Sequence, residues 1–197
     1  MTYQINKLRE EYSNSLYLSE SLSKYSWFNL GGKAELFFRP KNIADLKKFL
    51  EKLGGQKEIN ILGAGSNTLI RDGGLDGVTI KLGSKFSNIN LIDENILEIG
   101  AATLDKKIAD FAKQNSLSGL EFLSCIPGSI GGGIKMNSGC YGEDISGVFI
   151  SIKAIDKFGN FIEFSKKDIK FCYRGSDLPK DLIILSVRLK GKISKKK

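Results

Sequence analysis

The sequence predicts an α+β fold built from two successive units, because helix and strand patterns alternate twice along the chain. The first unit has an apolar strand at Ala34–Phe38, a helix from Asn42 to Gly54, and strands at Glu58–Leu62 and Val78–Leu82. Asn42 is a favourable N-cap, and Gly54 supplies the left-handed residue that commonly ends a helix.

The second unit begins near Ser84 and is rich in strands. Strands at Ile89–Ile92 and Ile96–Gly100 flank a polar turn, and either Thr103 or Asp105 is expected to cap the helix that follows. Three further strands complete the unit at Phe149–Asp156, Phe161–Phe164 and Leu182–Leu189, the first two as a hairpin.

A glycine-rich stretch, Gly119–Gly142, separates that helix from the hairpin, and seven of its 24 residues are glycine. Neither an amphipathic helix nor an alternating strand fits Ser124–Gly139, because glycine disfavours both elements. The stretch is nevertheless too apolar for a solvated linker. Two interpretations remain open: the backbone passes close to a flat cofactor, or the glycines form a buried turn where two elements cross.

The composition is that of a globular protein, with 197 residues, 41% of them hydrophobic and 26% charged. No run of about 18 apolar residues is present, and Met1–Glu20 lacks the apolar core of a secretory signal. We therefore expect no membrane insertion and a cytoplasmic location. The net charge of +8 comes from scattered lysines, with the densest run at Lys195–Lys197. An anionic small molecule explains this charge at least as well as nucleic acid does, and we expect no nucleic-acid partner.

Two residue types restrict the chemistry. The chain has no histidine, which excludes a Ser-His-Asp triad, a His-activated cysteine, imidazole zinc ligands and flavin attached through histidine. Cys125, Cys140 and Cys172 are odd in number and widely spaced, which predicts reduced thiols and no metal site. Any chemistry must come from a cofactor or from Arg, Lys, Ser, Tyr and carboxylates.

The first candidate site is the loop Gly63–Thr68, where a strand leads into a Gly-Ala-Gly-Ser-Asn sequence. Successive backbone N–H groups in such a loop converge into an anion-binding nest. The loop is not a P-loop, because no Lys-Ser/Thr pair follows its second glycine. It also departs from the dinucleotide fingerprint, because Thr68 occupies the position of the third glycine. A tight turn without a ligand explains the loop equally well.

The second candidate is Arg174, which lies in the sequence Tyr173-Arg174-Gly175-Ser176 after an apolar stretch. An arginine in this setting is usually a surface cation, and the local sequence favours that interpretation. The alternative is a fixed positive charge that stabilises an anionic intermediate.

Six blocks follow one another along the chain: Trp27–Ala34, Leu62–Asn67, Gly119–Glu121, Ile126–Gly132, Asn137–Gly142 and Tyr173–Ser176. In this order they closely resemble the UDP-N-acetylenolpyruvoylglucosamine reductases, a family of flavoenzymes of bacterial peptidoglycan precursor synthesis. The resemblance is collinear from about Tyr25 to Leu189. Its most specific parts are the Gly-x-Gly-Ser-Asn block and the Ile-Pro-Gly block with its Asn-x-Gly-x-Tyr-Gly continuation.

The resemblance implies two FAD-binding α+β subdomains of the vanillyl-alcohol-oxidase (PCMH) type, with FAD held non-covalently. We divide the chain into a lead-in (1–24), a first subdomain (25–83), a second (84–190) and a Lys-rich tail (191–197). The lead-in is expected to be partly helical, because Ile5, Leu8, Tyr12 and Leu16 recur at near-helical spacing. The cofactor-binding positions that it implies are Gly63, Ala64, Gly65, Ser66, Asn67, Thr68, Ile126, Pro127, Gly128, Ser129, Gly131, Gly132, Asn137, Gly139 and Tyr141.

By the same resemblance, NADPH reduces FAD, and the flavin passes hydride to the enolpyruvyl double bond of a UDP-sugar. Arg174 stabilises the developing enolate, and Tyr173 and Arg174 contact the substrate. The family's third domain, its proton-donating serine and a glutamate near its C-terminus have no match here, and Ser176 belongs to the arginine's own motif. We therefore expect a partial chain that binds FAD weakly at most and does not turn over alone.

Two other functions remain open at this point. One is another FAD-linked oxidase or dehydrogenase of the same fold. The other is a basic binding module, which predicts no flavin colour and a nucleic-acid affinity that depends strongly on salt. The oligomeric state is not predicted.

Overall fold

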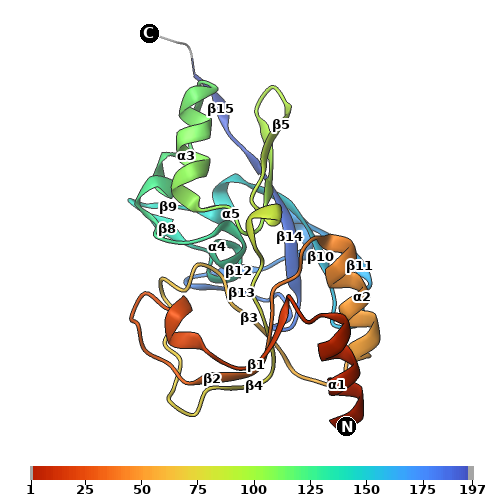
Figure 1. Cartoon of the computed structure of the whole chain (residues 1–197). Coiled ribbons are helices and arrows are strands. Elements are labelled where there is room, and N and C mark those ends of the chain that lie inside the picture. Colours follow the sequence, from red (N-terminus) through yellow and green to blue (C-terminus); the bar gives the residue numbers. More distant parts are fainter. Residues whose placement is uncertain (1, 195–197) are drawn as a thin grey trace.

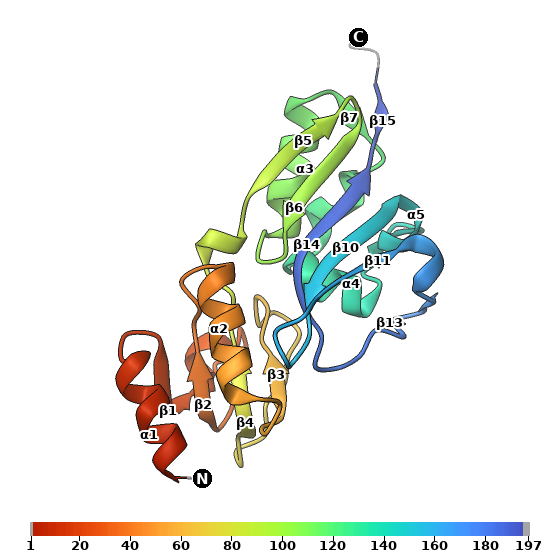
Figure 2. The same ribbon diagram turned by 90° about the vertical axis from the view of Figure 1, so that its right-hand side faces the viewer.

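The computed structural model describes residues 2–194, which form two main sheets with helices packed on them (Figure 1). The first sheet lies with α1 and α2 in the lower left of Figure 2, and the second lies with α3, α4 and α5 in the upper right. Helix and strand are mixed in both halves, which confirms the α+β prediction.

The first sheet has four strands in the order β1-β2-β4-β3. They are β1 (Leu16–Ser21), β2 (Lys33–Phe38), β4 (Leu75–Ile80) and β3 (Ile59–Ile61). Strand β4 pairs in parallel with both β2 and β3, and β1 pairs antiparallel with β2. The carboxyl ends of the three parallel strands therefore lie at one edge of the sheet, the edge where α/β proteins usually bind ligands.

One face of this sheet is covered by α1 (Thr2–Glu11) and α2 (Ile43–Leu53). As predicted, the Asn42 side chain accepts a hydrogen bond from the backbone N–H of Asp45, and Gly54 ends α2 with a φ of 59°. The rings of Phe38 and Phe49 stack with their centroids 3.9 Å apart. Local capping and sheet packing thus agree in fixing this helix.

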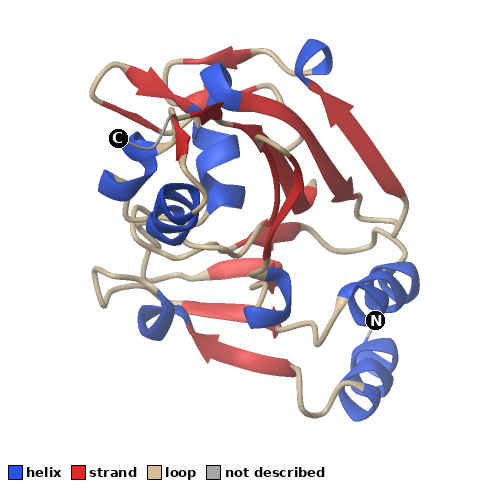
Figure 3. Cartoon of the chain, turned by 90° about the horizontal axis from the view of Figure 1, so that it is seen from above, coloured by secondary structure: helices blue, strands red, loops and turns tan. Residues whose placement is uncertain are grey.

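The second sheet has five antiparallel strands in the order β11-β10-β14-β6-β5. They are β11 (Phe161–Ser165), β10 (Phe149–Ile155), β14 (Ile183–Lys190), β6 (Ile96–Gly100) and β5 (Ile89–Asp93). Figure 3 shows this sheet curving around the helices on its inner side. Those helices are α3 (Asp105–Gln114), α4 (Ile130–Met136) and α5 (Ile145–Val148), and they share one buried apolar core with the sheet.

Three short two-stranded pairs complete the fold. They join β7 (Leu117–Ser118) to β15 (Lys192–Ile193), β8 (Gly139–Cys140) to β9 (Glu143–Asp144), and β12 (Phe171–Cys172) to β13 (Gly175–Ser176). Part of the predicted tail, at β15, is therefore a strand, whereas the run Lys195–Lys197 lies outside the described residues.

The two sheets are fixed to each other by shared burial. Ile155 at the end of β10 and Ile183 and Leu185 in β14 are buried in the apolar core of the first sheet. The same strands belong to the second sheet, so relative movement of the halves would expose apolar surface. A site between the two halves therefore has walls of defined spacing.

No helix runs through the whole of Ser124–Gly139, but a short helix that the sequence did not predict, α4, forms within it at Ile130–Met136. Ile130 and Ile134, one turn apart, are fully buried. A Cβ atom on Gly131 would lie 3.0 Å from the Ala101 carbonyl oxygen, and one on Gly133 would lie 2.7 Å from Ile145 Cδ1. Close packing therefore requires these glycines and offsets their poor helix propensity.

Two local predictions fail. Leu16 was expected on the helical face of the lead-in, but it begins β1, because pairing with β2 decides the conformation there. Asp105 was one of two expected caps, but it is the first residue of α3, and the residue before it, Leu104, makes no side-chain cap. Thr103, the other expected cap, hydrogen-bonds to the Asn88 carbonyl oxygen instead.

The thiols of Cys125, Cys140 and Cys172 are all free of disulfide bonds, as the prediction of reduced thiols requires. Within residues 2–194, no helix combines the length and apolar character that crossing a membrane requires.

Candidate functional site

The three sequence segments singled out above meet at one cleft of about 770 Å³ between the two halves of the chain. The loop after β3 forms one wall, the segment leading into α4 forms another, and Arg174 and Lys180 border it. The predicted cofactor positions that line it are Gly63, Ala64, Gly65, Ser66, Asn67, Thr68, Ile126, Pro127, Gly128, Ser129, Gly131, Gly132 and Gly139.

The loop Gly63–Thr68 follows β3 at the carboxyl edge of the parallel strands. Gly65 has a φ of 73°, and a Cβ atom there would lie 1.9 Å from the Tyr25 carbonyl oxygen. The Gly65 carbonyl oxygen accepts a 3.0 Å hydrogen bond from the backbone N–H of Trp27. The loop is therefore pressed against the segment before β2, and only glycine fits at position 65.

The backbone N–H groups of this loop are free to bind a ligand. Within residues 2–194, none of the N–H groups of residues 63–68 donates a hydrogen bond to another protein atom. Consecutive unpaired N–H groups after a strand are the donors that an anion-binding nest requires. The loop thus fits a phosphate-bearing ligand.

Lys81, which the sequence analysis missed, adds positive charge to the same wall. It directly follows β4, beside β3, and its Nζ donates a hydrogen bond to the carbonyl oxygen of Gly63. Burial, with a smaller contribution from the charge of Arg39, lowers the pKa of the Lys81 amine. The signal that could have found Lys81 is its place at the carboxyl end of a strand adjacent to the loop.

The opposite wall is the backbone of α4 and the loop before it. Gly131 and Gly133 pack against protein, whereas a Cβ atom on Gly132 would meet only Ser129 Oγ, at 3.9 Å. Gly132 therefore turns an uncovered stretch of backbone toward the cleft. Such a surface allows a flat ring system to approach more closely than side chains would permit.

Asp105 also lines the cleft and was not predicted as a site residue. Its side chain is fully buried, and neither carboxylate oxygen has a hydrogen-bond partner among the described residues. Burial raises the pKa of this carboxyl to about 7. A single sequence carries no signal for this residue, because its burial depends on contacts with Gly128 and Gly133.

Arg174 occupies the turn between β12 and β13 and lines the cleft. Its φ of 58° is left-handed, a conformation that disfavours arginine. The guanidinium carbon lies 5.5 Å from the centroid of the Tyr173 ring, and none of the ion pairs within residues 2–194 involves Arg174. Arg174 is therefore a positive charge available to a ligand. Tyr173 itself is 90% exposed and does not line the cleft.

Lys135 also lines the cleft and, like Lys81, was not predicted from the sequence. Burial lowers the pKa of its amine to about 8, against a smaller opposing effect of Asp181. Its Nζ donates to the carbonyl oxygen of Pro179, and its own carbonyl oxygen accepts a 3.2 Å hydrogen bond from Ser176 Oγ. Lys135 thus joins α4 to the hairpin that carries Arg174.

Asn137 lies behind the cleft wall and does not line it. It ends α4 with a left-handed φ of 42° and is 7% exposed. Its Nδ2 donates to Asp144 Oδ2 at 3.2 Å and to the Cys172 carbonyl oxygen at 3.3 Å, and its Oδ1 accepts from the Ser146 N–H at 3.0 Å. The geometry gives Asn137 a positioning role between α4 and the arginine hairpin.

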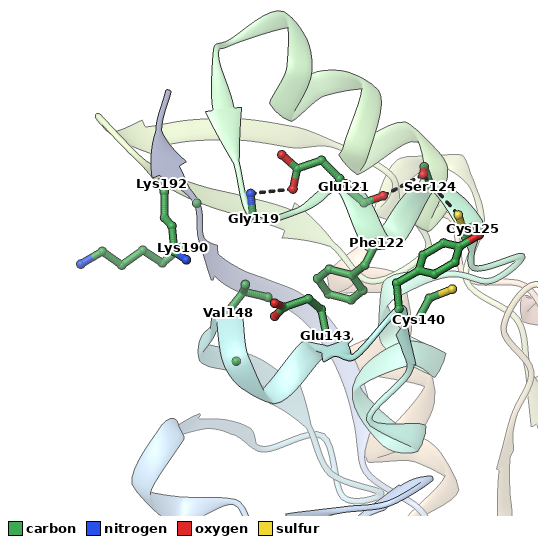
Figure 4. Close-up of a pocket in the computed structure, with 13 residues that line it drawn as sticks. Gly119, Glu121, Phe122, Ser124, Cys125, Cys140, Glu143, Val148, Lys190 and Lys192 are labelled. Carbon is green, nitrogen blue, oxygen red and sulfur yellow. Dashed lines mark hydrogen bonds between the residues drawn. The ribbon is translucent and has the colours of Figure 1, made fainter. Parts of the chain in front are cut away.

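A second pocket of about 580 Å³ lies next to the cleft (Figure 4). Cys125 and Cys140 line both cavities, so they form part of the boundary between them. Tyr141 lines this second pocket and not the cleft, and it is 86% exposed. Figure 4 also shows the hydrogen bond that the Glu121 carboxylate accepts from the backbone N–H of Gly119. The distance from Gly119 N to Glu121 Oε2 is 2.6 Å.

Taken together, the cleft fits FAD. The unpaired N–H groups of residues 63–68 and the Lys81 amine suit a pyrophosphate, and the Gly132 backbone suits a flat ring. The buried Asp105 carboxyl has no hydrogen-bond partner among the described residues. Four cationic side chains line the cleft, namely Lys81, Lys135, Arg174 and Lys180. A ligand with both anionic and planar parts is therefore favoured.

Comparisons with known proteins agree with this assignment. Residues 34–165 match the family described as FAD binding domain. The chain is 48% identical to the UDP-N-acetylenolpyruvoylglucosamine reductase of Pelagibacter ubique over 95% of its own length and 62% of that protein. It is also 48% identical to the reductase of Rickettsia canadensis, over 86% of this chain and 57% of that one. The chain thus spans about three fifths of the length of these curated relatives.

Two solved structures superpose on this chain. The UDP-N-acetylenolpyruvylglucosamine reductase from Thermus caldophilus superposes with a TM-score of 0.77 at 29% identity, covering 91% of this chain and 62% of that one. A p-cresol methylhydroxylase with substrate bound superposes with a TM-score of 0.69 at 10% identity, covering 98% of this chain and 44% of the other. The second likeness shows the fold alone, and it agrees with the PCMH-type fold expected from the sequence.

Proposed function

This chain belongs to the FAD-binding domain family and is homologous to the UDP-N-acetylenolpyruvoylglucosamine reductases, and on that premise we propose the function of those relatives for it. The reaction is the NADPH-driven reduction of UDP-N-acetylglucosamine enolpyruvate to UDP-N-acetylmuramate, with FAD bound non-covalently in the cleft. The observation that carries the proposal is the convergence of loop 63–68, the α4 segment and Arg174 on one cleft.

In this proposal, each wall of the cleft has a separate task. The N–H groups of residues 63–68 and the Lys81 amine hold the pyrophosphate of FAD. The uncovered Gly132 backbone gives the planar part of the cofactor close contact with the wall. The thirteen lining positions named above are the residues that we assign to FAD.

FAD, when bound, supplies the hydride-transfer chemistry, with NADPH as the donor that reduces it. The task of Arg174 is electrostatic. Hydride addition to the enolpyruvyl group places negative charge on its carboxylate side, and the unpaired guanidinium of Arg174 stabilises that charge. The Tyr173 ring, whose centroid lies 5.5 Å from the guanidinium carbon, gives Arg174 a cation–π contact. Tyr141 lies outside the cleft, so its assignment rests on the family resemblance alone.

The proposed reaction belongs to peptidoglycan precursor synthesis, and through it to cell-wall biogenesis, cell shape, the cell cycle and cell division. We accordingly propose a cytoplasmic location, where UDP-sugars and NADPH are available, and small-molecule partners in place of nucleic acid. The division of the chain at 24, 83 and 190 also remains a proposal. The boundaries at 83 and 190 are supported, because β2, β3 and β4 of the first sheet lie within 33–80 and the strands of the second sheet lie within 89–190. The boundary at 24 has no such support, because β1 (Leu16–Ser21) belongs to the first sheet and lies in the lead-in.

The experiment is a coupled assay on the purified 197-residue chain. The chain is mixed with FAD and NADPH, and NADPH oxidation is followed with and without the enolpyruvyl UDP-sugar. We expect any NADPH oxidation above background to depend on that substrate, and we expect little of it, because the chain spans only about three fifths of these relatives. A flavin-loaded chain that oxidises NADPH equally without the UDP-sugar would favour another flavin oxidase. A chain that takes up no flavin and binds nucleic acid in a salt-dependent way would favour a basic binding module.

A further inference from the structure

The buried carboxyl of Asp105 is the least explained group in the cleft. Asp105 begins α3, and its backbone N–H donates a 3.1 Å hydrogen bond to the Gly128 carbonyl oxygen. A Cβ atom on Gly128 would lie 2.9 Å from Asp105 Oδ2, and one on Gly133 would lie 3.8 Å from Oδ1. The backbones of these two glycines therefore pack close to the buried carboxyl, and Asp105 is among the residues that line the cleft.

A structural role does not account for this group. Neither oxygen has a partner among the described residues, and no ion pair there involves Asp105. Of the buried side-chain oxygens without a partner, the only other one in the described part of the chain is Thr79 Oγ1, in β4 and outside the cleft. A buried carboxyl without a partner destabilises a fold by about 1–3 kcal/mol. Native proteins usually avoid such groups unless they serve a function.

We propose that Asp105 is a cofactor-binding residue whose carboxyl group hydrogen-bonds a heterocyclic edge of the FAD held in the cleft. The inference rests on the proposed function only in taking FAD as the ligand. It adds a residue that neither the family motifs nor the α4 and loop 63–68 assignments include. The carboxyl lies beside Gly128 in the loop before α4, and its chemistry indicates which part of FAD it contacts.

The chemistry of the carboxyl supports a ring edge. Burial favours its neutral form, which has one O–H donor and one carbonyl acceptor side by side. That pair is complementary to an N–H beside a carbonyl or ring nitrogen, which both heterocycles of FAD present. A phosphate offers acceptors only, so it would leave the carbonyl oxygen of Asp105 unpaired.

Two variants separate a ligand role from a structural one, because a ligand role predicts higher stability with lower FAD affinity for the first and nearly unchanged affinity for the second. Asp105→Leu removes the unpaired carboxyl, so the FAD-free chain should unfold at a higher denaturant concentration. The same variant should bind FAD at least about tenfold more weakly, since about 1.4 kcal/mol of hydrogen bonding is lost. Asp105→Asn keeps a donor and an acceptor and should bind FAD within about threefold of the parent chain.

The measurements are FAD titration by flavin fluorescence and urea unfolding of the FAD-free chain. Thr79→Val is the matched control: it removes the other unpaired buried oxygen and should leave FAD affinity unchanged. If leucine at position 105 prevents folding, Asp105→Ala carries the same affinity test. Parent-like FAD affinity in the leucine or alanine variant overturns the inference about Asp105 alone. A parent chain that binds no FAD overturns the proposed function as well, so the two failures are distinguishable.

Discussion

A Cβ atom on Gly63 would lie 2.9 Å from the hydroxyl oxygen of Ser129, so the loop after β3 touches the loop before α4 directly. These residues belong to different halves of the chain, and both line the cleft. The cleft is thus bounded by both halves of the chain and is not a groove on one of them. Its shape depends on the apolar residues that the halves share, Ile155, Ile183 and Leu185.

Gly65→Ala should disrupt the first wall of the cleft. The new Cβ would lie 1.9 Å from the Tyr25 carbonyl oxygen at a φ of 73°, so the loop must move. We expect the free energy of unfolding to fall by more than about 1 kcal/mol and FAD affinity to fall with it. Urea unfolding and FAD titration measure the two effects. Gly83→Ala is the control, because no heavy atom lies within 4 Å of its ideal Cβ, and a similar loss there would refute the explanation.

Asn137→Gly should weaken the attachment of the arginine hairpin. Glycine tolerates the left-handed φ of 42° but loses the hydrogen bonds to Asp144, Ser146 and Cys172. We expect the free energy of unfolding to fall by about 2 kcal/mol in urea. Asn29→Gly is the matched control, because Asn29 is exposed and also left-handed, with a φ of 54°. Equal effects of the two variants would show that the side-chain bonds of Asn137 contribute nothing.

Arg174→Gly should lower activity without lowering the stability of the folded chain. Glycine relieves the left-handed φ of 58°, so the free energy of unfolding should stay constant or rise by up to about 1 kcal/mol. Whatever substrate-dependent NADPH oxidation the parent chain shows should fall at least about a hundredfold, because a fixed charge at the enolate is lost. Arg174→Lys keeps the charge and should retain more activity than glycine. Parent-like oxidation by the glycine variant would contradict the role given to Arg174.

The raised pKa of Asp105 predicts a pH-dependent stability. The unfolded chain releases this proton near pH 3.8, whereas the folded chain keeps it until about pH 7. Between these values the folded state binds more protons, so its stability falls as pH rises, by up to about 4 kcal/mol across the window. The measurement is urea unfolding of FAD-free parent and Asp105→Asn chains from pH 4 to pH 8. A constant stability difference between the two chains over that range would contradict the buried, unpaired carboxyl.

The features that the sequence predicted correctly are local ones. The ends of α2 follow from Asn42 and Gly54, whose capping needs only neighbouring residues. The loop Gly63–Thr68 and Arg174 could be singled out because their residue types suit anion binding, and their meeting at one cleft followed from the family resemblance.

The features that the sequence missed depend on distant contacts. Helix α4 forms because Gly131 and Gly133 pack against Ala101 and Ile145, which no local propensity indicates. Asn137 supports the site through bonds to residues as far along the chain as Cys172. Asp105 becomes a site residue only because the cleft and its burial arise together in the folded chain.

The most direct test of the account is a titration of the purified chain with FAD, followed by visible absorption and flavin fluorescence. The three converging segments predict saturable binding at one FAD per chain, with a shifted flavin band and weaker binding in Gly65→Ala. Added pyrophosphate should compete with FAD, because loop 63–68 and Lys81 bind that group. Unsaturable binding, or equal binding by parent and Gly65→Ala chains, would contradict the assignment of this cleft to FAD.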